Sequence, residues 1–301
     1  MPLHPKRSCI AFKIEGTPGT AETLTATEAA FNAYEHSAVA NVPMAIREGQ
    51  LAFSGLIATP GTRSATMTFQ TDMYTAPAWE SMLGACGMTQ GTPDIWTANS
   101  ASANMSTATI ARYMDGKVYR MKGAMGTFSL QFRPGQVTRV LWTFTGVIDS
   151  WGTDATLLAP TLPLTAASAP RYASSTTTVG AVTLFFGALD INKNNTVTLL
   201  EDGGTTANGL YRAWLQDGIV GGSIDHEEAL ASARDDFSFW LTPTEKALSI
   251  AYASMSVSVP NLQYLNLPQG VRNGASVLNA TWQANRAASA GDDELVIDLS
   301  T

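Results

Sequence analysis

The strongest constraint on this chain is an alternation of apolar and polar residues on both sides of Pro134-Gly135. Residues 127–133 and 139–145 each place large apolar side chains at every second position. A period of two puts those side chains on one face of an extended strand. The apolar positions are Phe128, Leu130, Phe132, Val140, Trp142 and Phe144. Two such strands joined by a Pro-Gly turn predict an antiparallel hairpin with one buried face.

The same alternation recurs along the chain and predicts a mainly β fold. Asp115-Gly116 is a second hairpin turn. Four further segments share the alternation: 66–70, 254–259, 278–283 and 294–299. Charged residues are 14% of the chain, against about 25% in an average soluble protein. With 45% hydrophobic residues, this composition excludes a disordered chain, a coiled coil and a charge-laced helical bundle.

The formal net charge is −7, which argues against a tight nucleic-acid binder, because neutralising phosphates needs clustered Lys and Arg. The first twelve residues lack the apolar core of a secretory signal, and the longest apolar stretch, 181–189, is too short to span a membrane. Cys9 and Cys86 stand alone, as in a protein made in a reducing cytoplasm.

The chain divides into an N-terminal arm, 1–35, with a short helix after Thr25, and a β domain, 36–301. A Pro- and Thr-rich connection over 153–180 divides this domain into halves, 36–150 and 180–301. Both halves share a loose plan of strand, excursion and hairpin, which leaves an ancient duplication open. An apolar stripe predicts one helix over 76–87, and the composition of 89–106 predicts a long loop.

Few residues offer catalytic chemistry. His4, His36 and His226 are solitary, and no nucleophile elbow, phosphate-binding glycine loop or paired-cysteine motif occurs. Acidic residues cluster at 225–228, 235–236 and 292–294, where solvated turns explain them better than the facing carboxylates of a glycosidase. We therefore expect no enzyme, no cofactor and no metal site.

One segment copies the spacing of a calcium-binding loop. Asp190, Asn192, Asn194 and Glu201 stand at its first, third, fifth and twelfth positions. Asn195 replaces the required glycine, and the flanks have strand patterns instead of helical ones. An Asn-rich hairpin turn explains the same residues, so we favour the turn over calcium.

The order of features resembles the major tail tube protein of long-tailed (siphovirus-like) bacteriophages. Thr-rich strands over 47–74 precede the helix at 77–87. A glycine-punctuated hairpin series follows, and the chain closes on residues 291–298. The series contains Asp115-Gly116-Lys117, Gly123, Gly126, Pro134-Gly135 and Gly146, and the second half adds Gly222–Glu227 and Pro260–Tyr264.

The resemblance implies a β-sandwich or barrel with one short flanking helix and long loops. It implies a structural protein of the virion tail, assembled in the host cytoplasm as rings of six copies that stack into a hollow tube. The tube would meet tape-measure, tail terminator and distal tail proteins, and double-stranded DNA would pass through it without specific binding. An acidic wall repels phosphate, so the first candidates for the lumen are Asp225, Glu227, Glu228, Asp235 and Asp236.

Two alternatives remain open. One is another virion β protein, such as a tail-completion, baseplate or decoration component, because sandwich folds serve all of these. The other is a carbohydrate-binding β-sandwich, in which an exposed Trp151, Trp214 or Trp240 would stack on sugars.

Overall fold

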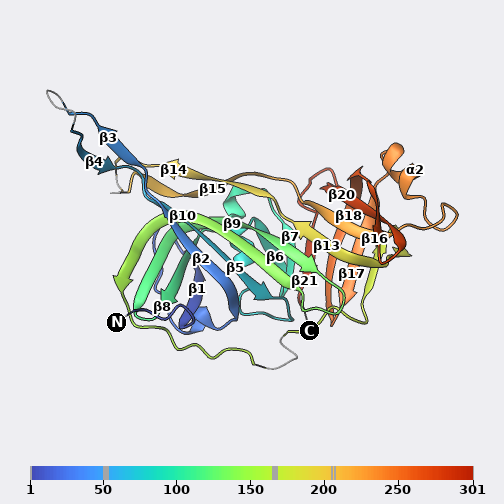
Figure 1. The fold of residues 1–301 in the computed structure, drawn as a ribbon, viewed down its shortest axis with the longest axis horizontal. Helices are drawn as coiled ribbons and strands as arrows, with labels where there is room; N and C mark the ends of the chain where they lie inside the picture. The colour runs from blue at the N-terminus through green and yellow to red at the C-terminus, as the bar shows by residue number, and fades with distance from the viewer. Residues whose placement is uncertain (1, 50–53, 165–168, 205, 207, 301) are drawn as a thin grey trace.

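The computed structural model describes residues 2–49, 54–164, 169–204, 206 and 208–300. It confirms the mainly β prediction, with 54% strand and 6% helix. Most strands belong to one antiparallel network, and two further hairpins are paired separately. Figure 1 shows two β bodies side by side, with both termini on the same side of the molecule.

The first body, residues 8–154, has the strand order β1-β8-β9-β10-β5-β2. Its strands are β1 (Ser8–Ile14), β2 (Ala33–Asn41), β5 (Ser64–Asp72), β8 (Ala108–Met114), β9 (Lys117–Phe132) and β10 (Arg139–Asp154). Between β2 and β5 the chain runs out and back as β3 (Met44–Arg47) and β4 (Leu56–Pro60). This β3–β4 hairpin is the first arm.

The second body, residues 176–298, repeats that order as β11-β17-β18-β20-β16-β13. Its strands are β11 (Thr176–Val179), β13 (Phe186–Asn192), β16 (Gly221–Glu227), β17 (Lys246–Tyr252), β18 (Met255–Asn266) and β20 (Ala275–Asn285). The second arm, β14 (Asn195–Glu201) and β15 (Leu210–Gly218), leaves between β13 and β16 as the first does between β2 and β5. The two bodies are therefore repeats of one topology.

Local geometry supports the equivalence. A two-residue turn with positive φ at both residues joins β8 to β9 at Asp115-Gly116, and another joins β17 to β18 at Ala253-Ser254. The amide of Ile148 donates to the carbonyl of Arg63 at 3.2 Å, and that of Ala284 donates to Val220 at 2.8 Å. These bonds occupy the same place beside the base of each arm, so they align β10 with β20.

The repeats are joined edge to edge. The C-terminal part of β9 pairs with β13 of the second repeat, Leu130 standing opposite Ile191. Strands β5, β10, β9, β13, β16 and β20 consequently form one continuous antiparallel sheet through both repeats. Each repeat also has additions: β6 (Met88–Thr92), β7 (Ile95–Ala98), β12 (Val182–Thr183), β19 (Gln269–Arg272) and the C-terminal β21 (Val296–Asp298).

The two arms have different surroundings. The second arm lies across β9 and β10 of the first repeat, whereas the first arm projects away from the molecule (Figure 1). The second arm buries Leu215 and Ala213 against Met125 of β9. The first arm leaves Ile46 and Ile57 more than four-fifths exposed.

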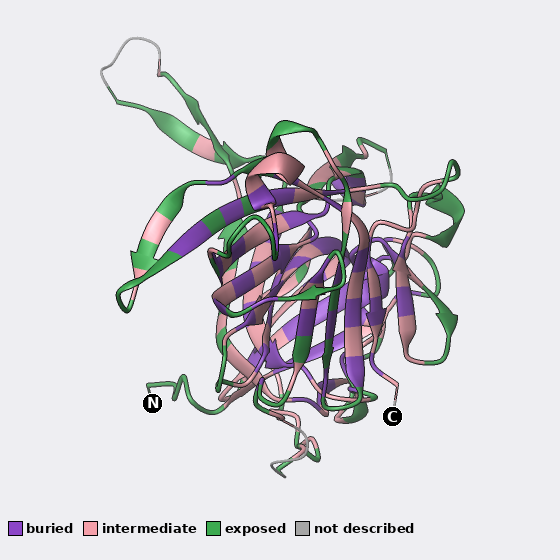
Figure 2. Cartoon of the chain, turned by 90° about the vertical axis from the view of Figure 1, so that its right-hand side faces the viewer, coloured by how far each residue is buried: buried purple, intermediate pink, exposed green. Residues whose placement is uncertain are grey.

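One apolar core runs through both repeats. Trp142, Phe144 and Phe69 of the continuous sheet pack beneath α1 (Met82–Ala85) and β1. Figure 2 shows buried and more exposed bands alternating along the strands, as the period of two predicted. Burial of alternate residues is what fixes the strand register.

Several sequence expectations were wrong in detail. The stripe predicted as a helix over 76–87 is buried, but only Met82–Ala85 is α-helical, because i+3 turns precede it and glycines follow. The expected loop over 89–106 contains β6, β7 and the 3-10 turn Ser102–Asn104. The expected N-terminal arm contains β1, which pairs with β8, as well as the 3-10 turn Thr27–Ala29.

Candidate assembly surfaces

The face of the continuous sheet that points away from the core is mostly polar, and the charged side chains at its edges and along its rows are paired with one another, as Arg139 is with Asp72 at 3.2 Å. Its partly exposed side chains alternate with the buried ones along each strand. The register aligns them in rows across both repeats, for example Gln131, Asp190, Ser223 and Thr281. We call this the polar face: Thr66, Thr68, Gln70, Thr127, Ser129, Gln131, Leu141, Thr143, Thr145, Asp190, Asn192, Ser223, Asp225, Asn279 and Thr281.

The charges on the polar face are held in ion pairs. Asp190 lies 2.9 Å from the guanidinium of Arg133, and Asp225 lies 2.8 Å from that of Arg272. Arg272 also approaches Glu227 at 3.5 Å. Pairing leaves the arginines of this face with little free positive charge to offer a phosphate.

The five acidic candidates for the lumen do not share one surface. Asp225 and Glu227 lie on β16, and Glu228 follows them and accepts hydrogen bonds from Gln269 and Ser276. Asp235 caps the short helix α2 (Asp236–Leu241) by accepting from the amide of Ser238 at 2.9 Å. Of these, Asp225 and Glu227 project from the same side of β16, where both approach Arg272.

Asp236 is a correction, because it is 3% exposed and cannot face a lumen. Arg234 Nε donates to its carboxylate at 2.8 Å, and Nε2 of the buried His226 lies 3.3 Å from it. Burial alone would raise the pKa of Asp236, but the hydrogen bonds and charges of His226 and Arg234 outweigh it and lower that pKa. Asp236 is a structural carboxylate that anchors α2.

The segment proposed as an alternative calcium loop does not form one. Asp190 and Asn192 belong to β13, and Glu201 ends the extended strand β14. An extended strand rises about 3.3 Å per residue, so the first and twelfth positions are far apart. Asp190 instead pairs with Arg133, and Asn194 Nδ2 donates to the carbonyl of Ile219. The favoured hairpin turn was also wrong, since β13 continues into β14 through a bend at Asn194, where φ is 52°.

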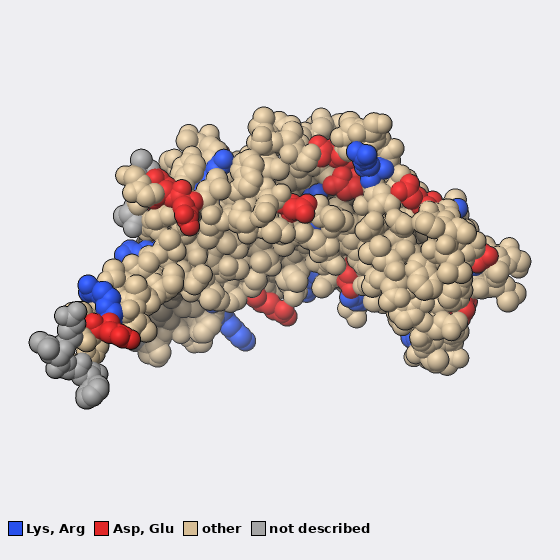
Figure 3. All heavy atoms as spheres, turned by 90° about the horizontal axis from the view of Figure 1, so that it is seen from above, with Lys and Arg blue, Asp and Glu red and all other residues tan. Residues whose placement is uncertain are grey.

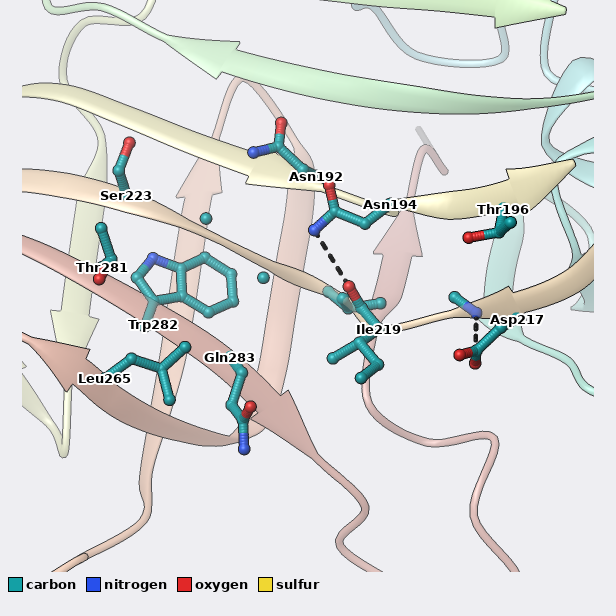
Figure 4. A pocket seen from close by; sticks show the side chains of 14 residues that line it. Asn192, Asn194, Thr196, Asp217, Ile219, Ser223, Leu265, Thr281, Trp282 and Gln283 are labelled. Carbon is teal, nitrogen blue, oxygen red and sulfur yellow. Dashed lines mark hydrogen bonds between the residues drawn. The ribbon is translucent and has the colours of Figure 1, made fainter.

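A groove opens at the base of the second arm (Figure 4). Its volume is about 580 Å³. Trp282 lies on its floor, with Leu265 and Ile219 at its sides. These two aliphatic side chains are 53% and 57% exposed, which is unusual for such large apolar groups beside a groove.

The free arm and its neighbour β2 form a second apolar surface. Its exposed side chains are Val39, Met44, Ile46, Leu56 and Ile57. Apolar exposure on this scale marks an interaction surface. The alternation at 66–70 gave no sign of it. Large apolar residues at 44, 46, 56 and 57, on both sides of Gly49 and Gly55, were a signal that sequence reasoning missed.

The three tryptophans considered for sugar stacking are partly buried and lie on different elements. Trp151 packs edge-on against Tyr119, and Trp214 lies under the guanidinium of Arg212. Trp240 of α2 donates its indole N–H to the carbonyl of Leu265. They form no common platform.

Charged side chains are dispersed over the surface seen in Figure 3, between broad uncharged areas. Among the described residues, no group of His, Cys, Asp and Glu has the geometry to hold a metal ion. None of the described helices is long and apolar enough to cross a membrane.

Comparison of the chain with protein-family models and with curated proteins found no match in either case.

Proposed function

We propose that this chain is a structural subunit of a viral tail tube, in which rings of copies stack around a bore that conducts double-stranded DNA. The observation that carries the proposal is the polar face, which extends through both repeats on one continuous sheet. Such a sheet has one face committed to the core. The second arm covers part of the other face, around Thr127 and Met125 of β9, and the remainder is free to line a bore.

The chemistry of the polar face suits a wall past which DNA slides. Protein–DNA affinity comes mainly from Lys and Arg that neutralise phosphates. On this face the side chains are mostly hydroxyls and amides, and Arg133 and Arg272 are paired with carboxylates. The net charge of −7 per chain adds a general repulsion of DNA.

The apolar surfaces suit self-assembly. A soluble monomer seldom exposes an arm as apolar as β3–β4. In a ring such an arm is covered by a neighbour. The edge of β2 that has no partner among the described strands is then protected from indiscriminate pairing. Partners at the ends and inside the tube, namely terminator, distal tail and tape-measure proteins, belong to the same proposal.

Electron microscopy of the purified protein tests it. We expect rings or hollow tubes of uniform diameter, which lengthen as protein concentration rises. Particles that remain monomeric at concentrations where the apolar arm should associate would overturn the proposal. A closed, unstacked oligomer would favour a capping or decoration role in the virion.

A further inference from the structure

We propose that the contact joining the two repeats inside the chain is repeated between chains, so that the second repeat of one copy receives β2 and the first arm of the next copy. The closure of this contact into a ring rests on the proposed function, whereas the contact itself does not.

The internal junction provides the template. There, β9 presents residues 129–132 to β13, and Leu130 and Ile191 face each other with 1% and 0% exposure. On the other side of β9, Leu130 pairs with Val140 of β10. Ile148 of β10 is equivalent to Ala284 of β20, so eight residues earlier Val140 is equivalent to Ser276. Ser276 pairs with Val271 of β19. Val271 is therefore the second repeat's counterpart of Leu130.

The edge at Val271 has no strand beside it among the described residues. Of the described strands, β20 alone pairs with β19 there, and Val271 is 78% exposed. On the other repeat, β5 is the one strand that pairs with β2 in the described part of the chain. The β2 residue Ala40 is the counterpart of the buried Ile191. An antiparallel pairing of β19 with β2 of a second copy places Val271 opposite Ala40 and covers both.

The contacts of the second arm inside the chain provide a template for the first arm as well. Inside the chain, the second arm packs Leu215 on Met125, and near its tip Asn208 Nδ2 donates to the carbonyl of Ile148 at 2.7 Å. The amide of Arg63 donates back to the carbonyl of Asn208 at 3.2 Å. The tip of the second arm is thus hydrogen-bonded to the first repeat at the base of the first arm.

The counterparts of Ile148 and Arg63 are Ala284 and Val220. Val220 lines the groove of Figure 4, as does Gln283, the neighbour of Ala284. We therefore assign that groove to the first arm of the next copy. Its exposed Leu265 and Ile219 would meet the apolar side chains of β3–β4, as Met125 meets those of β14–β15. In Figure 1 the free arm projects on the side of the first repeat away from the second, where this arrangement requires the next copy.

The repeat changes the copy number expected of a ring. If the resemblance to sixfold tail tubes holds for the repeats, three chains supply the six repeats, and the ring has threefold symmetry with a pseudo-sixfold wall. Each chain then uses one heterologous contact twice, once inside itself and once with its neighbour.

Cysteine cross-linking tests the register. In the variant carrying A40C and V271C, the new thiols lie opposite each other across the interface, within the reach of a disulfide or a short bismaleimide. The native thiols give little background, since Cys86 is buried and burial raises the pKa of Cys9 to about 11. We expect a covalent species of three chains by denaturing mass analysis.

Three controls sharpen the result. A mixture of the A40C and V271C single variants should stop at covalent pairs. A variant with A40C and L241C, which places the second thiol on the exposed face of α2, should not cross-link. Circular dichroism of each variant checks that it folds.

Absence of cross-linking in folded A40C/V271C protein would overturn the pairing, and covalent species of six chains or an endless ladder would overturn closure at three. Hollow tubes without this cross-link would leave the proposed function standing while the inference fails. Cross-linked rings of three chains that never stack would support the inference and overturn the proposed function.

Discussion

Ile191 of the second repeat stands directly opposite Leu130 of the first, and the two buried side chains close the junction between the repeats. The junction is thus built as a strand pairing inside a core, and not as a loose contact between domains. Its counterpart on the outer edge of β19, Val271, is mostly exposed.

Because Leu130 is buried and Val271 is exposed, truncating each to alanine should affect stability unequally. Leu130→Ala should lower the free energy of unfolding by about 2–5 kcal/mol, because it opens a cavity at the junction. Val271→Ala should change it by less than about 0.5 kcal/mol in the isolated chain. Denaturant titration of the monomer measures both. Equal losses in the two variants would show that Val271 is already packed within its own chain.

The first arm offers a test of assembly separate from folding. Ile57→Asp places a charge on a side chain that is 87% exposed, so the monomer should keep its stability. Burying that charge in the groove of a neighbour costs several kcal/mol, and association should weaken by at least about tenfold. Sedimentation velocity against concentration measures the change.

Leu164→Asp is the matched control, since Leu164 is 88% exposed but lies in the connection between the repeats. It should assemble as the parent does. If both variants lose association equally, net charge and not the arm is responsible.

Because the arginines of the polar face are paired with carboxylates, removing those carboxylates should make this face bind DNA. Replacing Asp190 and Asp225 with Asn removes the carboxylate partner of Arg133 and the nearer of the two carboxylates of Arg272, which keeps Glu227 at 3.5 Å. The assembled variant should bind double-stranded DNA with an affinity that falls steeply as salt rises, while the parent protein does not. Co-sedimentation of labelled DNA measures this. Adding R133Q and R272Q should abolish the gain, and DNA binding equal to that of the parent would contradict the assignment of this face.

The sequence was sufficient for the hairpins and for the core. Phe128, Trp142 and Phe144 are buried as their alternation predicted, since a period of two leaves only one register that hides them all. The turns at Asp115-Gly116 and Pro134-Gly135 connect the strands that were expected to pair. Local chemistry decides such features, so a single sequence suffices for them.

The duplication and the surfaces were beyond local patterns. The equivalence of Leu130 and Val271 depends on strand order, which pairs residues distant in sequence, and the two repeats differ in their arms and additions. The bend at Asn194 looked like a hairpin turn because Asn favours both. Asp236 looked like part of a solvated cluster because nothing near it in sequence shows that His226 and Arg234 enclose it.

The enclosed Asp236 predicts an acid-sensitive element. Its pKa is lower in the folded chain than in the unfolded one, so the carboxylate contributes stability above the usual Asp pKa of about 4. That contribution is lost as pH falls below about 4 and through the lower folded-state pKa. Asp236→Ala should cost about 3–5 kcal/mol at neutral pH, because Arg234 is left buried without its partner.

Unfolding free energies measured from pH 7 to pH 3 test this. The gap between the parent and Asp236→Ala should narrow as the pH falls. Asp235→Ala, which removes a helix cap, is the control and should cost only about 1 kcal/mol. A gap that stays constant down to pH 3 would contradict the assigned ion pair.

The buried Glu15 supports the part of β9 on which the second arm rests. Its Oε1 accepts from the Thr109 hydroxyl and the Gly123 amide, and its Oε2 accepts from the Thr107 hydroxyl and the Gly19 amide. Gly123 has φ of +55°, and a Cβ there would lie 2.8 Å from Cβ of Arg212 on the second arm. The buried carboxylate therefore fixes the strand segment on which the arm rests.

Glu15→Gln should cost about 1–3 kcal/mol, because either orientation of the amide turns its NH₂ toward the backbone N–H of Gly19 or of Gly123, which then loses its acceptor on this side chain. Hydroxyls can rotate, but the amides of Gly19 and Gly123 cannot. Glu22→Gln, at a solvent-accessible carboxylate on the neighbouring loop that pairs with Lys13, is the control and should change stability far less. Hydrogen exchange should show faster opening of β14–β15 in Glu15→Gln alone, and unchanged exchange in that arm would mean that Glu15 supports only its own loop.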